Sequence, residues 1–300
     1  MKKNLILTLA FLCLLNVSLF AQDATPDTTA APKKWDLGLT TSINFSQVTF
    51  TNWAAGGDNS FSLNSFVNTF ANYKNGKHNW DNSLQLGYGI INTKDQPLKK
   101  SDDKINLDSK YGWEINKLFR VTASLNAKTQ FSSTYEYKDD GTANLVSNFM
   151  APGYLTAGVG IDIVPLKWLS INVSPAVGKL TFVTIEELQV QYGNDLGQVC
   201  KPRFGGLIKI DMKKEVLKNV ELASNLTLFT DYLDESSFDI AVNWDVFIIM
   251  KINKFLSANL TTNLIWDRDI LTTDTNGDGV KDVAKAQFKE LFGIGLTFSF

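Results

Sequence analysis

Hydrophobic and polar residues alternate with a period of two along most of this chain. In the segment 119–131 the odd positions are mostly apolar, and the even positions carry Arg, Thr, Ser, Asn, Lys and Gln. Successive side chains of a strand point to opposite faces, and strands that cross an outer membrane alternate lipid-facing apolar with lumen-facing polar residues. The pattern therefore predicts an all-β protein, a transmembrane antiparallel β-barrel of about 12 strands over residues 35–300.

Twelve segments carry this alternation, although the second has Phe66 and Phe70 on its otherwise polar face. They cover about 35–45, 60–74, 80–90, 105–115, 119–131, 154–164, 168–183, 203–213, 220–232, 238–251, 256–266 and the end of the chain.

The links between these segments alternate in length. Every second link is short, such as "KNGK", where Asn75-Gly76 is a strong two-residue hairpin signal. The other links are mostly longer, at about 49–59, 92–104, 132–153, 184–202, 233–237 and 268–285. Short periplasmic turns that alternate with longer external loops are typical of outer-membrane barrels, and an even strand count puts both chain ends on the periplasmic side.

Aromatic residues gather at both ends of the predicted strands. Those at the short-turn ends are Trp35, Tyr73, Trp80, Trp113, Phe119, Trp168 and Phe298. Those near the long-loop ends are Tyr88, Phe131, Tyr232, Phe238, Trp266 and Phe288. Two aromatic girdles are expected where a barrel meets the two membrane interfaces. A secreted β-sandwich is the alternative, but it requires neither two girdles nor long strands throughout.

The chain ends on "FGIGLTFSF", residues 292–300, whose alternate positions are all large and apolar. We interpret this stretch as the last strand, with its apolar face toward lipid. A terminal aromatic resembles the signal that the barrel-assembly machinery recognises, so that machinery and outer-membrane lipid are the expected partners. Strict alternation would also point Glu290 toward lipid, and a bulge near the outer rim could turn it inward.

The N-terminal residues predict export. Residues 1–21 combine a basic start, an apolar run and a small residue at Ala21, as a cleaved signal peptide does. The run is short for a retained membrane anchor, which is the alternative. Residues 22–34 are small and polar and are expected to be a disordered linker. The expected location is the outer membrane of a Gram-negative cell, and Cys200 alone would remain in the mature chain.

The stretch 50–70, "FTNWAAGGDNSFSLNSFVNTF", resembles a family of uncharacterised outer-membrane proteins. That family is typical of Bacteroidota and is catalogued only as a domain of unknown function. The resemblance extends over the mature chain, and its most specific part is Trp53 followed by Gly56, Gly57, Asp58, Asn59 and Ser60. It implies an outer-membrane location, and it carries over no catalytic or binding residue.

Composition and motifs argue against several functions. The formal charge is −2 and only three Arg occur, so no nucleic-acid surface is expected. No GxSxG, HExxH, CxxC or P-loop pattern is present. Outer-membrane phospholipases use a Ser-His-Asn site, but the sole histidine, His78, lies beside a predicted periplasmic turn. We therefore expect no enzymatic activity.

The predicted lumen is the largest candidate site. Its charged candidates are Asp108, Lys110, Glu114, Arg120, Lys128, Glu221, Asp231, Asp239, Asp245 and Asp267. Basic residues on the fourth and fifth segments could face acidic residues on the ninth to eleventh and create a transverse field. The same residues could instead pair and close the interior. About 12 strands lie between a side-chain-filled barrel and an aqueous channel, and inward phenylalanines favour a narrow or plugged lumen.

Two loops carry further candidates. Trp53, Gly56, Gly57 and Asn59 belong to a loop that could constrict the pore or contact a partner, or simply form a hairpin with an interfacial Trp. In "DTNGDGVKD" the spacing of Asp274, Asn276, Asp278, Val280 and Asp282 matches the first nine positions of a calcium loop. Position twelve is Lys285 rather than Glu, and a merely soluble acidic loop is the alternative. We favour a weak external Ca²⁺ site, and we expect no other cofactor.

Two functional classes therefore stay open. One is a narrow channel or small-solute uptake protein that uses a polar, mixed-charge lumen. The other is a structural or accessory barrel whose external loops meet a protein partner. The number of Asn, Asp, Lys and Thr residues on the inner face favours the first class.

Overall fold

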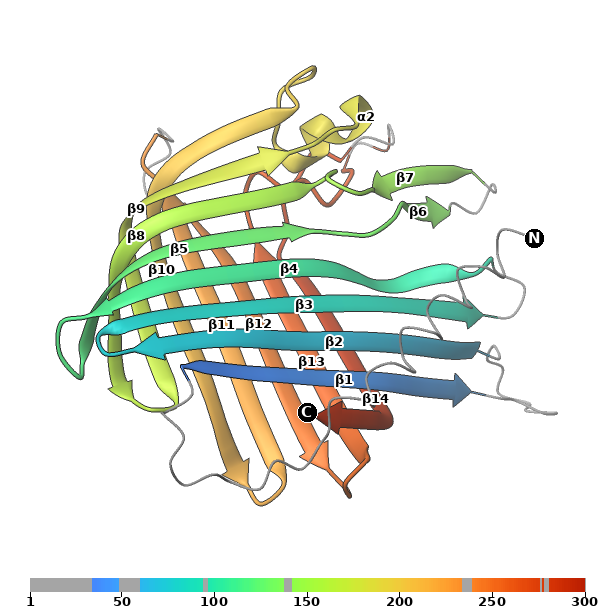
Figure 1. Ribbon diagram of the computed structural model, residues 1–300. Helices are drawn as coiled ribbons and strands as arrows, with labels where there is room; N and C mark the ends of the chain where they lie inside the picture. The colour runs from blue at the N-terminus through green and yellow to red at the C-terminus, as the bar shows by residue number, and fades with distance from the viewer. Residues whose placement is uncertain are drawn as a thin grey trace, which may run out of the picture. The chain divides into compact units, whose positions relative to one another are not determined.

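Residues from Trp35 onward form a closed barrel in which every neighbouring pair of strands is antiparallel (Figure 1). The computed structural model describes residues 34–48, 60–93, 97–137, 142–233, 239–275, 277 and 281–299. The chain divides into two compact units, Met1–Lys34 and Trp35–Phe300, and the second holds the barrel. The predicted signal peptide, most of the linker, Phe238, Phe300 and the Trp53 loop lie outside the described residues.

Twelve strands close the barrel, in agreement with the predicted number. They are β1 (Trp35–Val48), β2 (Ser60–Asn75), β3 (His78–Thr93), β4 (Lys99–Glu114), β5 (Phe119–Thr129), β8 (Gly153–Leu166), β9 (Leu169–Phe182), β10 (Cys200–Leu217), β11 (Val220–Asp231), β12 (Ile240–Lys251), β13 (Leu256–Trp266) and β14 (Gln287–Ser299). Consecutive barrel strands pair with each other, and β1 pairs with β14 to close the ring. The predicted antiparallel all-β barrel is confirmed.

Two predicted external loops contain structure of their own. The loop after β5 forms a two-stranded hairpin of β6 (Thr134–Tyr137) and β7 (Ala143–Ser147). The loop after β9 forms the short helix α2 (Glu186–Gln189) and the 3₁₀ turn η2 (Val190–Tyr192). Neither has the length or regular alternation that would reveal it in the sequence. In addition, β4 begins at Lys99, six positions before the predicted strand.

The distribution of residues is the inverse of that in a water-soluble fold. Among the described residues, thirteen polar side chains are buried against six apolar ones. Large apolar side chains instead lie on the outer face, such as Leu107, Leu125, Val159 and Ile294, each at least 42% exposed. Water-soluble monomers rarely expose contiguous apolar surface of this extent. The inverted pattern excludes the β-sandwich alternative, since a sandwich would bury its apolar faces.

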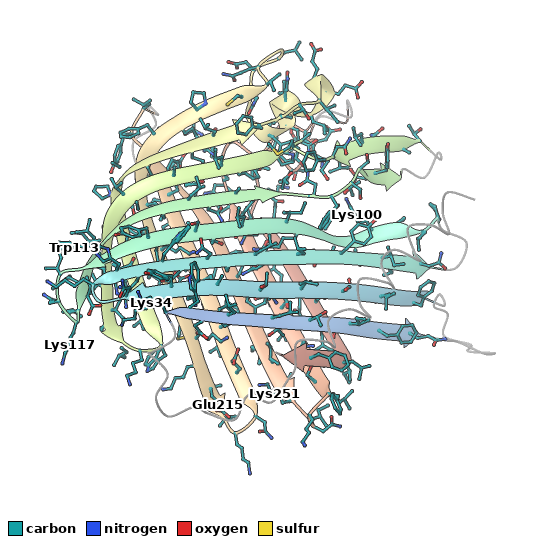
Figure 2. All side chains as sticks on the ribbon, in the orientation of Figure 1. Lys34, Lys100, Trp113, Lys117, Glu215 and Lys251 are labelled. Carbon is teal, nitrogen blue, oxygen red and sulfur yellow. The ribbon has the colours of Figure 1, made fainter. Side chains whose placement is uncertain are left out.

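The two ends of the barrel differ as the link lengths predict. Gly76 has φ +58° in the two-residue turn between β2 and β3, and Asn219 has φ +65° between β10 and β11. Figure 2 shows Trp113 and Lys117 at the short-turn end, with Lys100 toward the long-loop end of β4. At the short-turn end the Trp35 and Tyr73 ring centroids are 5.1 Å apart. Tyr88 and Phe131 form a similar contact at the other end.

Glu290 does not turn inward. The pairing of β13 with β14 runs from Ile265–Gln287 to Leu256–Leu296 without a register shift, and Thr262 is the partner of Glu290. The pairing with β13 has no bulge at this position, so Glu290 keeps the outward orientation that strict alternation predicts and shares that face with Phe288 and Phe292. It lies three residues from the outer end of β14, where an outward carboxylate is closest to the membrane surface.

The polar lumen as the candidate functional site

Alternation on β4 sends Lys104, Asn106 and Asp108 into the lumen, where they meet residues from distant strands. The Lys104 Nζ lies 4.0 Å from the Asp245 carboxylate of β12. Five strands separate β4 from β12 in either direction around the barrel, so this ion pair joins opposite walls. Lys104 also lies 5.9 Å from the ring centroid of Phe247. Side chains thus cross the full width of the lumen.

Further charges lie at the same level of the barrel. Lys209 of β10 donates to Asp108 at 3.4 Å and lies 3.8 Å from Asp211. Lys128 of β5 pairs through its main chain with Asn106, between Lys104 and Asp108. The central cluster is defined here as Lys104, Asp108, Lys128, Lys209, Asp211 and Asp245. It constricts the lumen with side chains of both signs.

Nearer the short-turn end, a buried carboxylate binds the wall of β8 to its neighbours. Asp162 is 1% exposed, lies 2.8 Å from Lys110 Nζ, and accepts a 2.7 Å hydrogen bond from Asn172 Nδ2. Asn172 also donates to the hydroxyl of Thr122, and Ser174 donates to Asn172. A buried charge requires such a partner set, because unpaired it would be strongly destabilising.

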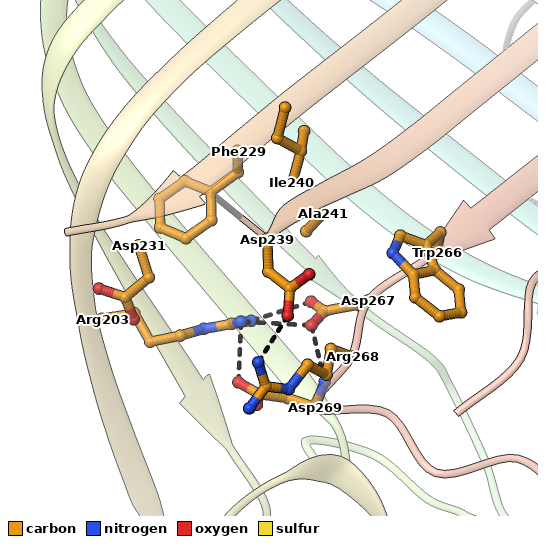
Figure 3. A pocket seen from close by; sticks show the side chains of 10 residues that line it. All are labelled: Arg203, Phe229, Asp231, Asp239, Ile240, Ala241, Trp266, Asp267, Arg268 and Asp269. Carbon is orange, nitrogen blue, oxygen red and sulfur yellow. Dashed lines mark hydrogen bonds and ion pairs between the residues drawn. The ribbon is translucent and has the colours of Figure 1, made fainter. Parts of the chain in front are cut away.

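At the outer mouth, a second network holds the segment after β13 (Figure 3). The Arg203 guanidinium lies 3.0 Å from Asp267 and 2.9 Å from Asp269, and Lys179 lies 3.1 Å from Asp267. Lys201 lies 3.3 Å from Asp269. Burial alone would raise the pKa of Asp267, but Lys179 and Arg203 outweigh burial and hold that pKa well below its usual range. Asp267 is therefore charged at neutral pH.

Residues 267–271, called the strap below, run from β13 toward β9 and β10. Three strands lie between β13 and β9, so the strap crosses part of the outer mouth as a chord. The Leu271 N–H donates to the Gln191 carbonyl at 2.9 Å, and Lys201 donates to the Gly193 carbonyl at 2.8 Å. Gly193 has φ +81°, and a Cβ there would lie 2.7 Å from the Asp269 Cβ. The strap is thus tied to the loop that carries α2.

That loop packs on the rim through a small apolar cluster of its own. Ala151, Val183 and Leu188 are buried together, with Leu145 and Tyr192 against them. The Tyr192 hydroxyl donates to the Val146 carbonyl at 2.9 Å, and burial raises the pKa of Tyr192 to about 12. The tyrosine therefore stays a hydrogen-bond donor at physiological pH.

Among the described residues, no helix is long and apolar enough to cross a bilayer.

The predicted lumen residues fall at three levels. Asp108, Lys128 and Asp245 belong to the central cluster. Lys110 pairs with Asp162, and Glu114 faces Arg120 as its main-chain partner nearer the short turns. Glu221 pairs with Lys213, which is 71% exposed at that end. The outer-mouth members are Asp231, Asp239 and Asp267, with Asp239 bound to Arg268 at 2.6 Å. The residues therefore do not converge on one site.

The barrel does not have one basic wall that faces one acidic wall. Lys201, Arg203, Lys209 and Lys213 all lie on β10, beside the strands predicted to be acidic. Sequence reasoning missed them, together with Lys104, which fell before the predicted start of its strand. Asp162 was missed as well, although it lies between the apolar residues Ile161 and Ile163. A polar residue at alternate positions within an apolar strand is the signal that could have found Lys209 and Asp162.

The two remaining candidates are the sole histidine, His78, and the predicted calcium loop. His78 lies at the short-turn end, where its Nδ1 is 2.5 Å from the Tyr111 hydroxyl. In the calcium-loop candidate, Asn276, Asp278 and Val280 lie outside the described residues. Asp274 accepts the Gly277 N–H at 2.7 Å, and Asp282 accepts the N–H and hydroxyl of Thr275 at 3.0 and 2.6 Å. The predicted calcium site stays a prediction.

An apolar outer face and a charged interior define the class of protein: a twelve-stranded barrel with a constricted polar lumen. Residues 45–135 match the model of a family described as "Protein of unknown function (DUF3078)". The predicted resemblance to a domain of unknown function is thereby confirmed over this stretch, which is shorter than the mature chain. No curated protein sequence matches the chain.

Solved structures with a similar fold include three barrels of low sequence identity. The translocator domain of autotransporter NalP from Neisseria meningitidis is 9% identical, with a TM-score of 0.40 and coverage of 98% of this chain and 97% of that chain. An outer-membrane channel from Pseudomonas putida F1 is 10% identical, with a TM-score of 0.40 and coverage of 93% and 100%. The NanC porin is 11% identical, with a TM-score of 0.39 and coverage of 88% and 99%. The barrel assignment rests on the strand pairing of this chain itself.

Proposed function

We propose that this protein spans the outer membrane of a Gram-negative cell after export through a cleaved signal peptide. The support is its outer surface: Leu107, Val121, Leu125 and Ile161 face away from the lumen and are more than 40% exposed. Lipid makes such a face favourable, whereas contact with water would be costly for every exposed apolar side chain. Lipid and the barrel-assembly machinery are then its partners during biogenesis.

Within that membrane, the protein acts as a narrow channel for small polar solutes. The observation that carries this proposal is the central cluster, where Lys104 and Asp245 approach from opposite walls of a polar lumen. A purely structural barrel would gain more stability from apolar filling, since ion pairs of this kind contribute little to folding. Ion pairs exposed to the lumen can instead separate as a solute passes. No enzymatic role is proposed.

Planar-bilayer conductance tests the channel. The wild-type barrel should give small steps, and Lys104→Ala with Asp245→Ala should give larger ones, because the constriction loses both side chains. Lys213→Met is the matched control, since Lys213 lies outside the central cluster and is 71% exposed. Silence from both the wild type and the double variant would exclude the channel.

The second candidate is an accessory barrel that binds a protein partner with its external segments. It is favoured by the ordered rim structure, where β7 and the α2 loop share an apolar cluster while Val190, Leu196 and Val199 stay 46–71% exposed. If no conductance is observed, crosslinking through the α2 loop in whole cells should capture one defined outer-membrane protein. A barrel that conducts and gives no such crosslink argues against this candidate.

A further inference from the structure

The central cluster is balanced in charge. Its cations are Lys104, Lys128 and Lys209, and its carboxylates are Asp108, Asp211 and Asp245. Three positive and three negative charges cancel, so the constriction attracts neither anions nor cations through a net field. Selection at this level must therefore come from how individual pairs exchange partners.

The Lys104–Asp245 pair of the central cluster is longer and more exposed to water than the ion pair that holds the outer mouth. Lys104 and Asp245 are 4.0 Å apart, with side chains 32% and 15% exposed. The Arg203–Asp267 pair at the outer mouth is 3.0 Å long, with side chains 9% and 6% exposed. Ion pairs that water reaches are weak, so Lys104 and Asp245 separate at a lower cost than Arg203 and Asp267.

A solute that passes between Lys104 and Asp245 separates this ion pair. It must then offer each side chain a new partner in place of the charge that the side chain has lost. An anion can pair with Lys104 but repels Asp245, and a cation does the reverse. A neutral solute offers neither side chain a charged partner, and Asp245 keeps only a neutral donor, Asn263 Nδ2 at 2.9 Å. A zwitterion offers a carboxylate to Lys104 and an ammonium group to Asp245, so that both keep a charged partner.

We propose that the central cluster selects small zwitterions, solutes that carry one ammonium and one carboxylate group as amino acids do. This inference rests on the proposed channel function and names its substrate class. The geometry also sets the orientation: the solute carboxylate faces Lys104 and Lys128 on β4 and β5, and the ammonium group faces Asp245 on β12. Phe247, 5.9 Å from Lys104, offers an apolar contact beside the acid.

Efflux from proteoliposomes tests the selection with four solutes of nearly equal size and shape. They are alanine, lactate, lactamide and alaninamide, measured at about pH 6 so that the alaninamide amine is protonated. Alanine should leave at least about fivefold faster than each of the others, the factor expected from keeping one weak ion pair. Planar-bilayer conductance is recorded on the same preparation.

Variants then assign the effect to the cluster. Asp245→Asn should abolish the advantage of alanine and speed lactate, because the acid that repels the anion is gone. Lys213→Met, at the short-turn end, should leave all four rates in their wild-type ratio. Equal efflux of the four solutes from a conducting barrel would overturn the zwitterion inference and leave the channel intact. Absence of both efflux and conductance would overturn the channel as well.

Discussion

Gly205 shows how closely single residues are constrained in this barrel. It lies on β10 where the pairing with β9 shifts register between Gly205 and Leu207. A Cβ at this position would lie 1.8 Å from the Thr230 carbonyl oxygen of β11. The obstacle is backbone, so it cannot rotate away as a side chain could. Gly178 on β9 has open space around it instead.

Replacement of Gly205 by Ala should therefore destabilise the barrel, by roughly 1–3 kcal/mol as for other overpacked sites. Urea unfolding of the refolded barrel in lipid vesicles, followed by tryptophan fluorescence, measures the change. Gly178→Ala is the matched control and should keep the wild-type midpoint. Equal midpoints for the two variants would mean that β10 can move away from β11 at no cost.

At the scale of elements, the strap depends on carboxylates held by three cations. Asp267 and Asp269 meet Lys179, Lys201 and Arg203, and the low pKa of Asp267 reflects this pairing. A group whose pKa is lowered on folding stabilises the folded state above its unfolded value, near 3.9 for Asp. That contribution is lost as the pH falls through the lower, folded pKa. The strap should thus tolerate mild acid.

Hydrogen exchange measures this directly at the Leu271 amide, which donates to Gln191. Corrected for intrinsic rates, its protection should persist from neutral pH to about pH 4 and decline only below. Asp267→Asn should lower that protection already at neutral pH, because Lys179 and Arg203 both lose the Asp267 carboxylate and Arg203 keeps only its contact with Asp269. Loss of wild-type protection between about pH 6 and 5 would contradict the role of Asp267.

The loop between β13 and β14 carries the calcium prediction. The five candidate ligands are Asp274, Asn276, Asp278, Val280 and Asp282. Calorimetry with Ca²⁺ on the refolded barrel should give a dissociation constant of about 1 mM, as for extracellular modules. Asp274→Ala with Asp278→Ala should remove the heat. Heat that is absent, or that survives both substitutions, would reduce the segment to an acidic loop.

The whole molecule is distinguished by polar residues inside and apolar residues outside. Leu125, near the middle of β5, is 42% exposed on that outer face. In water, Arg at such a site would be harmless, whereas at the midplane of a bilayer it costs about 2–4 kcal/mol. The same surface position therefore reports which solvent surrounds the barrel.

We expect Leu125→Arg to reduce the heat-modifiable, folded band recovered from the outer-membrane fraction. Leu125→Ala is the control and should be recovered almost as the wild type is, because it stays apolar. Recovery of the wild type as a soluble periplasmic protein, or an unaffected Leu125→Arg variant, would rule out the membrane location.

Alternation along the chain was enough to predict the barrel, the number of strands and the face that most strand residues occupy. These features depend on local rules: a period of two assigns the faces, and links such as Asn75-Gly76 assign the hairpins. The same rules missed β6, β7 and α2, because short elements held by rim contacts such as Val183 with Leu188 have no periodic signal. They also misplaced the start of β4.

Which charges meet depends on how the closed barrel brings distant strands together. Lys104 and Asp245 are 141 positions apart and lie on strands with five others between them on either side, so no local pattern links them. Closure of the ring fixes the lumen width, and that width decides whether inward side chains reach across or face water. The same applies to Arg203 and Asp267, which meet because the strap crosses the mouth. Alternation decides that a charge points inward, and the closed barrel decides its partner.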